Sequence, residues 1–198
     1  MARRADHTRE ELKELAIKAG IELIRKEGIS HFSARKLAGR IGYTVGTLYN
    51  VFGSYDEMIL QINARTLDEW FAIMQNAMQK NGKGNPLHAL ARSYIKYSKT
   101  HYQEWIALFE YHLSEDRELP QWYTPKMTRF FAIVEKLLLA KLNNQRKAKR
   151  AARVLWAGIH GICILSLSGK LDLVKADSPE VLAISFIDNY IAGLTHET

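Results

Sequence analysis

The sequence has very little cysteine and no uncharged segment long enough to cross a membrane. Its 198 residues include one cysteine, Cys163, which excludes an internal disulfide framework and fits a reducing compartment. The charged N-terminal stretch MARRADHTREEL lacks the apolar core of a signal peptide. The longest uncharged apolar stretch, Val154–Gly169, has 16 residues, whereas a spanning helix needs about 20. We therefore expect a cytoplasmic protein with no membrane partner, in which this stretch forms a buried helix.

The common catalytic motifs are also missing. There is no GxSxG turn, GxGxxG or phosphate-binding loop, HExxH motif or paired-cysteine zinc site. His101 and Glu104, like Glu110 and His112, lie close together in predicted helices, but neither pair has a third ligand in sight. We expect no metal and no cofactor, and a small helical enzyme is kept only as the alternative from another class.

Acidic residues are absent from a long part of the N-terminal region. None occurs between Glu27 and Asp56. Three cations lie in the same segment: Arg35, Lys36 and Arg40. Residues 1–53 carry ten Lys or Arg and six Asp or Glu, against eighteen and fifteen in the rest. With a net charge of +7 and a pI near 9.4, this distribution indicates a polyanionic partner for the N-terminal quarter.

Helical periodicity runs along almost the whole chain, and no segment alternates as a strand does. A hydrophobic content of 47% allows one sizeable core. Capping residues mark the starts of four N-terminal helices: Thr8 with Glu11, Ser33, Thr44, and Ser54 with Glu57. A linker, KNGKGNP, follows the fourth of these helices. Further helices are expected near 87–100, 102–114, 122–143, 146–169 and 179–195. The chain is predicted to be all-α.

Residues 33–51 fit two short helices joined by a glycine turn, which is the helix-turn-helix unit. Gly42 can adopt the positive φ of the turn, and Ala38 is small enough for a close helix crossing. The apolar face of the pair consists of Leu37, Ile41, Leu48 and Val51. The outward side chains suit a DNA major groove, which admits one α-helix. A solvated helical hairpin within an α-bundle is the alternative.

The segment FSARKLAGRIGYTVGTLYNVFGSYDEMI resembles the signature of TetR-family transcriptional regulators. GTLY is intact at residues 46–49, and Phe52 and Ser54 also match. The family often has His in place of Val51, and Lys in place of Tyr55, where the lysine commonly contacts a DNA phosphate. The resemblance covers residues 8 to about 60. It implies a three-helix DNA-binding domain over 1–53 and, over 54–198, a linking helix with a larger helical domain that binds a ligand and dimerises.

The resemblance also implies which residues contact DNA: Ser33, Arg35, Tyr43, Thr44, Val45, Gly46, Thr47, Tyr49, Asn50 and Tyr55. Hydroxyls and helix N-terminal amides donate to phosphates, asparagine can pair with adenine, and Gly46 lets the backbone approach the duplex. Arg3 and Arg4 could form a flexible arm on DNA, and an ordinary disordered terminus is the alternative.

Near the C-terminus, LWAGIHGI resembles the Trp-His-Gly motif that names one class of TetR-family C-terminal domains. Small residues in this helix, and an apolar stripe in the last one, predict a dimer interface. Its members are Ala157, Gly161, Ile164, Leu165, Ser168, Ala183, Ile187, Tyr190, Ile191 and Leu194. Packing within one subunit is the alternative.

Aromatic residues with an occasional polar side chain are typical of ligand pockets and equally typical of a core. The candidates for an effector site are Trp105, Phe109, His112, Tyr123, Phe130, Phe131, Trp156 and His160. The basic run over 141–153 is expected to be a solvated helix face.

We thus predict a homodimeric, sequence-specific DNA-binding regulator. A repressor is expected, binding a near-palindromic double-stranded operator and released by a small, largely apolar effector. A DNA-binding regulator without a small-molecule switch is the alternative.

Overall fold

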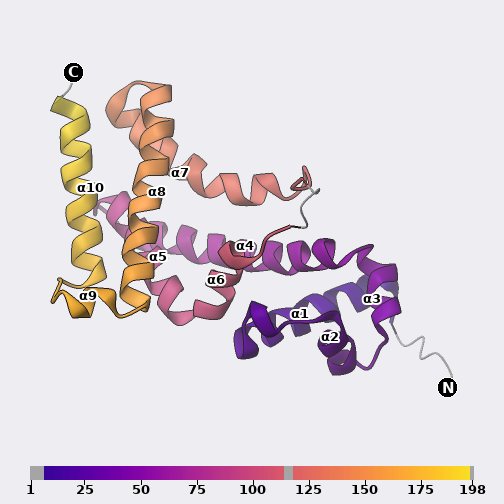
Figure 1. Ribbon diagram of the computed structural model, residues 1–198. Helices are drawn as coiled ribbons and strands as arrows, with labels where there is room; N and C mark the ends of the chain where they lie inside the picture. The colour runs from indigo at the N-terminus through magenta and orange to yellow at the C-terminus, as the bar shows by residue number, and fades with distance from the viewer. Residues whose placement is uncertain (1–6, 114–117, 197–198) are drawn as a thin grey trace. The chain divides into compact units, whose positions relative to one another are not determined.

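The computed structural model describes residues 7–113 and 118–196, and these residues form helices without a strand (Figure 1). The predicted all-α fold is confirmed. The helices are α1 (Arg9–Glu27), η1 (Ile29–His31), α2 (Ala34–Ile41), α3 (Val45–Phe52), α4 (Tyr55–Lys80), α5 (Pro86–Thr100), α6 (Tyr102–Glu110), α7 (Thr124–Leu142), α8 (Gln145–Leu167), α9 (Lys170–Leu173) and α10 (Pro179–His196). Arg3 and Arg4, predicted to form a DNA arm, lie outside the described residues.

The capping residues begin helices where the sequence predicts. Thr8 and Glu11 form a complete capping box at α1, each side chain accepting from the backbone N–H of the other. Ser33 Oγ accepts a backbone N–H of α2 at 3.2 Å, and Ser54 Oγ does the same for α4 at 3.1 Å. Each of these bonds satisfies a donor that a helix start leaves open, which typically stabilises by about 1 kcal/mol.

Helix ends depart from the prediction in two places. The helix expected over 102–114 ends at Glu110, because Tyr111 has extended backbone with φ −77° and ψ 122°. The helix expected over 146–169 ends at Leu167, and the short α9 follows Gly169, whose φ is 69°. A left-handed glycine ends the helical path without changing the apolar pattern, so periodicity alone did not show this break.

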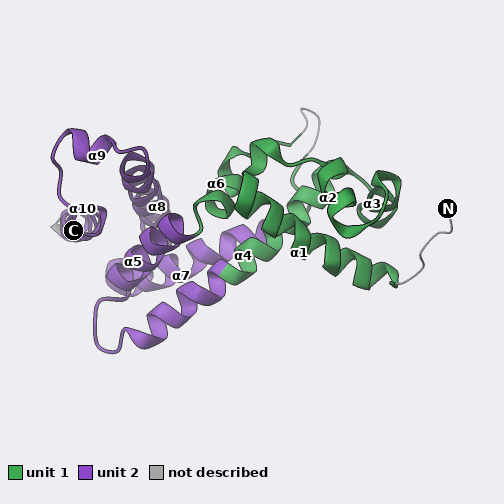
Figure 2. Cartoon of the chain, turned by 90° about the horizontal axis from the view of Figure 1, so that it is seen from below, with its two compact units in different colours: residues 1–69, 101–123 green, residues 70–100, 124–198 purple. Residues whose placement is uncertain are grey.

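The chain forms two compact units (Figure 2). Unit 1 consists of residues 1–69 and 101–123, and unit 2 of residues 70–100 and 124–198. The first part of α4 and all of α6 therefore belong with the helix-turn-helix, and the second part of α4 belongs to unit 2. The boundary predicted after Gly53 does not coincide with a boundary of these units, and a DNA-binding domain over 1–53 stays a prediction.

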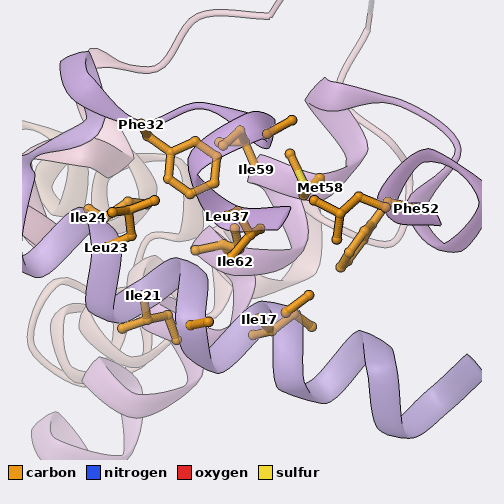
Figure 3. Close-up of a cluster of buried hydrophobic side chains, with 14 of the residues drawn as sticks. Ile17, Ile21, Leu23, Ile24, Phe32, Leu37, Phe52, Met58, Ile59 and Ile62 are labelled. Atoms are coloured by element: carbon orange, nitrogen blue, oxygen red, sulfur yellow. The ribbon is translucent and has the colours of Figure 1, made fainter. Parts of the chain in front are cut away.

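The core of unit 1 joins side chains from α1, α2, α3 and α4 (Figure 3), together with Ala107 of α6. Leu37 and Leu48, at the centre of the predicted apolar face, are 0% exposed. Ile41 and Val51 pack against the same cluster and are partly buried. Burying one such side chain stabilises by about 1.5–3 kcal/mol. This shared core therefore fixes α2 and α3 relative to each other.

Two polar contacts attach α6 to the rest of unit 1. Arg25 Nε donates to the buried Glu104 Oε1 at 2.5 Å, which links α1 with α6. The Tyr111 hydroxyl donates to the buried carboxylate of Asp56 at the start of α4. Ala107, between these two points, is part of the core cluster. Glu104 thus has a structural ion-pair partner on α1.

In unit 2, α8 packs against α5 and α7 and lies alongside α10 (Figure 1). The close approach of α8 and α10 is at Gly158, where a Cβ atom would lie 2.2 Å from a ring carbon of Phe186. At Gly161, by contrast, a Cβ atom would have no neighbour within 4 Å. Within one chain the small residue that the packing requires is therefore Gly158, while Gly161 faces open space.

One side of α8 carries apolar side chains at the surface of the chain. Among the described residues, α8 is the helix that is long and apolar enough to cross a membrane, judged by length and composition only. Only 22% of its most apolar 18-residue segment is buried inside the chain. Its exposed large apolar residues are Val154, Trp156, Ile164 and Leu165. The prediction of a buried helix is wrong for this side of α8, because no other element of the described chain covers it.

Candidate nucleic-acid interface

The turn between α2 and α3 depends on one glycine and one threonine. Gly42 has left-handed backbone with φ 76°, and its N–H donates to the carbonyl of Ala38. The next N–H, of Tyr43, donates to the same carbonyl at 2.9 Å. Thr44 then caps α3 by accepting the Thr47 N–H at 3.1 Å. These bonds satisfy the backbone groups at both helix ends, and they set the direction in which α3 begins.

α3 has a buried side and an exposed side. Leu48 and Phe52 hold the helix in the unit 1 core. Tyr49 is 40% exposed, and Asn50 on the same side is also exposed. Of the other predicted contact residues on this helix and its N-cap, Thr44 and Gly46 are exposed and Thr47 is partly exposed. Val45 is partly buried, because its side chain packs against the unit 1 core and does not point fully outward as predicted. The structure therefore brings together the predicted contact residues from 44 to 50 on one short, accessible helix.

Besides Thr44 and Thr47, whose hydroxyls lie 2.9 Å apart, three more predicted contact residues use their side chains within the chain. The Ser33 hydroxyl caps α2, and the Tyr43 hydroxyl lies 2.8 Å from His7 Nδ1. The Tyr55 hydroxyl donates to the carbonyl of Phe32 at 3.4 Å, and burial raises the pKa of this phenol. Tyr55 thus points into unit 1, unlike the lysine that the family often carries there.

The cations of α2 differ in whether they are already paired. Lys36 Nζ lies 2.7 Å from a carboxylate oxygen of Glu27, and this hydrogen bond lowers the pKa of that carboxyl group. Arg40 pairs with Glu22 at 2.6 Å. Arg35 is exposed and makes no ion pair within the described part of the chain. Arg35 is therefore the cation of α2 with its charge available to a phosphate.

Arg9 is a residue of this surface that sequence reasoning missed. Its guanidinium donates to the backbone carbonyls of Asn50 and Val51 at 3.4 and 3.2 Å. These carbonyls lie in the last turn of α3, where a positive charge is favourable. The contact joins residues 41 and 42 positions apart, so no local motif could have indicated it.

The predicted effector residues fall into both units. In unit 1, Trp105 is fully buried with its ring centroid 5.2 Å from that of Phe109. Tyr123 is buried, which raises its pKa to about 12. His112 is exposed, and its Nδ1 lies 2.8 Å from the carbonyl oxygen of Glu110.

The other four residues of that set lie in unit 2. Trp156 lies between Phe131 and His160, with ring centroids at 5.5 and 5.6 Å. His160 Nδ1 and the Tyr94 hydroxyl share a hydrogen bond of 2.9 Å, and burial lowers the pKa of this imidazole. Phe130 belongs to a group of rings around Trp70. The predicted site stays a prediction, with members in two units.

The predicted dimer residues also divide by exposure. Ala183 and Ile187 of α10 are 0% and 1% exposed within their own chain, and Leu194 is buried too. These three face the core of their own subunit and leave a second chain almost no surface to contact. Exposed or partly exposed members remain along α8 and α10: Ala157, Gly161, Ile164, Leu165, Ser168, Tyr190 and Ile191.

Comparison with known proteins agrees with this arrangement. Residues 16–62 match the family model described as bacterial regulatory proteins, tetR family. Residues 87–189, just over half of the chain, match the model of a tetracyclin repressor-like C-terminal domain. A curated relative, an uncharacterized HTH-type transcriptional regulator of Mycobacterium tuberculosis, is 22% identical over 84% of this chain and 75% of its own.

Solved structures share the fold across nearly the whole chain. A protein of unknown function from Rhodococcus sp. RHA1 has a TM-score of 0.75 and 16% identity, with 98% of each chain covered. The multidrug binding protein EbrR, solved with proflavin, has a TM-score of 0.61 and 18% identity over 90% of this chain and 98% of its own. Together with an exposed α3 held on a helix-turn-helix core, the two family models show that the chain belongs to the TetR family of DNA-binding transcriptional regulators.

Proposed function

We propose that this regulator reads DNA by placing α3 in a major groove. The observation that carries the proposal is the exposed side of α3, which offers hydroxyl and amide groups without a nearby acid in sequence and is anchored by the buried Leu48 and Phe52. An α-helix fits this groove, and its N-terminal residues meet the base edges.

Individual roles follow from exposure and from existing partners. Tyr49 and Arg35 contact phosphates, because both are exposed and long enough to reach the backbone. Asn50 reads a base edge through its amide. Thr44 and Thr47 hold each other at 2.9 Å between their hydroxyl oxygens, so their contribution includes fixing the first turn of α3.

TetR-family regulators act as dimers, and we propose that this one dimerises through the exposed side of α8 with part of α10. A second copy would cover the apolar surface of Ile164 and Leu165, which is otherwise left in water. The open space at Gly161 allows another helix to approach closely there. Two-fold symmetry makes the operator a near-palindrome.

The regulator acts as a repressor that a small, largely apolar molecule releases from DNA. Family members bind small-molecule ligands, and EbrR was solved with imidazole and with proflavin. The effector must bind the DNA-incompetent state more tightly, with a typical coupling of about 1–3 kcal/mol. We place the protein in the cytoplasm, where its DNA lies. Family assignment favours this role over an enzymatic one.

Selecting genomic DNA fragments with the purified protein, and sequencing them, tests the proposal. On a selected fragment, Tyr49→Ala should weaken binding to every sequence, while Asn50→Ala should change the preferred operator. Each lost contact should cost about 1–3 kcal/mol. Tyr102→Ala is the matched control, since this tyrosine of α6 is 42% exposed but lies outside the helix-turn-helix. Unchanged operator affinity in a folded Tyr49→Ala protein would refute the docking of α3.

A further inference from the structure

A group of aromatic rings in unit 2 surrounds Trp70, at the point where α4 enters this unit. The Trp70 ring stacks on Tyr97 with centroids 4.9 Å apart and an interplanar angle of 9°. Tyr94 and Phe130 each approach it with centroids at 5.0 Å. The sequence shows Trp70 only as one member of a long apolar stripe, so its central position is decided by α5 and α7.

Two buried donors of this group have no acceptor. Trp70 is 4% exposed and Ser93 7%, and within the described chain neither the indole Nε1 nor the seryl Oγ has a hydrogen-bond partner. A neighbouring hydroxyl is satisfied, because Tyr94 shares its hydrogen bond with His160. Buried polar groups without partners are rare in folded proteins and are costly to retain.

Ser93 projects from the face of α5 that also carries Tyr97, the stacking partner of Trp70 on α4. Ser93 and Tyr97 are four residues apart in one helix, so their side chains project from the same face. Since Tyr97 stacks on Trp70, the Ser93 hydroxyl belongs to the face that carries this ring pair. A single flat molecule among these rings could accept from both the indole and the hydroxyl.

The two buried donors and a nearby guanidinium favour an acceptor over a cation. α5 and α8 contain no Asp or Glu, and the one acid of α7, Glu135, is paired with Arg153 at 2.6 Å. The guanidinium of Arg129 lies 4.2 Å from the ring centroid of Phe71, beside Phe130. Arg129 thus lies against these rings, while on α4 Asp68 and Glu69 directly precede Trp70 in the sequence. The two buried donors, rather than the overall charge, are what favours an acceptor.

We propose that this Trp70 cluster binds a flat aromatic anion, such as an aromatic carboxylate, whose oxygens accept hydrogen bonds from Trp70 and Ser93. The inference rests on the proposed function, since it names the chemical class of the effector. It differs from what EbrR holds in its solved complex with proflavin, a planar cation.

Calorimetric titration without DNA tests the ligand class. The probes are anthracene-9-carboxylate and proflavin, which share a three-ring plane and differ in charge. The carboxylate should bind at least about tenfold more tightly than proflavin, and Ser93→Ala and Trp70→Phe should each weaken it about tenfold, as expected for loss of one charge-assisted hydrogen bond. Proflavin binding as tightly as the carboxylate, or no binding of the carboxylate at millimolar concentration, would overturn the proposal.

Ser98→Ala supplies the matched control. Ser98 lies on the same helix and is fully buried, but its hydroxyl donates to the carbonyl of Ile95 at 2.9 Å. Without ligand, Ser93→Ala should leave the unfolding temperature unchanged or raise it, and Ser98→Ala should lower it. Ser98→Ala should also bind the carboxylate like the wild type. Equal destabilisation by both variants would show that Ser93 already has a partner, and would overturn the proposal.

A parallel measurement of binding to the selected DNA fragments separates this inference from the proposed function. Ligand-free Ser93→Ala should bind DNA as the wild type does. Failure of the wild type to bind any DNA would refute the proposed function, whatever the titrations show. Normal DNA binding without carboxylate binding would refute the ligand class alone.

Discussion

Unit 1 and unit 2 carry opposite net charges. The sequence of unit 1 has 12 Lys or Arg and 15 Asp or Glu, for a net charge of −3, and unit 2 has 16 and 6, for +10. Yet unit 1 holds the helix-turn-helix. For a surface that reads DNA, a local absence of acids and well-placed donors therefore matter more than the net charge of the whole unit, which can have the opposite sign.

The two units also differ in where their apolar side chains lie. Unit 1 gathers them in a core that joins five helices around Leu37 and Leu48. Unit 2 leaves part of its apolar surface on the outside of α8, including Ile164 and Leu165. A core of the first kind stabilises one chain, and a surface of the second kind suits a partner.

The largest expected effect is loss of the unit 1 core. Leu48→Ala should lower the free energy of unfolding by about 2–5 kcal/mol, because the side chain is fully buried and its removal leaves a cavity. Chemical denaturation measures the change. Leu173→Ala, at a residue that is 75% exposed, is the control and should have little effect. Equal effects of both variants would contradict the difference in burial.

A smaller effect is expected at the α8–α10 contact in unit 2. Gly158→Ala should cost about 1–3 kcal/mol, because the new methyl group would overlap the Phe186 ring. Gly161→Ala, whose Cβ atom would meet no neighbour within its own chain, should leave the stability of the dissociated subunit unchanged or raise it by up to about 1 kcal/mol through helix propensity, so the comparison is made at concentrations below dimer formation. Thermal unfolding compares the two variants, and a larger loss at Gly161 would reverse the assignment.

Assembly should depend on Gly161. Gly161→Trp should raise the dissociation constant of the dimer at least about tenfold, which is about 1.4 kcal/mol, because the indole would separate the two α8 helices. Sedimentation at micromolar concentration measures this, and circular dichroism checks that each subunit stays folded. A wild-type protein that is a stable monomer at those concentrations would contradict the proposed interface.

The salt dependence of DNA binding should reflect the charge of Arg35 rather than the net charge of either unit. Arg35→Gln should lower the slope of log affinity against log salt concentration by about 1 per subunit, because one phosphate contact is lost. Lys141→Gln is the control, since it removes a charge from the more basic unit 2 and should leave the slope unchanged. If the two variants changed the slope equally, net charge would govern binding after all.

The smallest expected effect is a dependence of stability on pH. Burial lowers the pKa of His160 in the folded protein, so the unfolded chain takes up the proton first as the pH falls. The neutral His160 side chain therefore makes its full contribution to the free energy of unfolding above its ordinary pKa, about 6.5. This contribution is lost as the pH falls from there toward the lower pKa of the folded protein. His160→Gln should lose less stability than the wild type between pH 7.5 and 5.5 in urea titrations.

Local sequence predicted the parts of the site that local chemistry controls. Thr44, Gly42 and Ser33 act within a few residues of chain, so their capping and turn roles could be predicted before the fold was known. Arg9 and Trp70 could not, because their partners lie on other helices. The same limit applies to Tyr55, whose hydroxyl turns toward a carbonyl 23 residues away.

By itself, the sequence determined the all-α fold and the helix-turn-helix, because both rest on periodicity or spacing within a short stretch, and the family was indicated by the resemblance of residues 32–59 to its signature. Only the tertiary structure decided which apolar residues are covered: Ala183 and Ile187 turn inward, and Ile164 and Leu165 stay outside. It also assigned the close helix contact to Gly158 rather than Gly161. Helical spacing places residues on a common face, but burial depends on which distant helix comes to lie against that face.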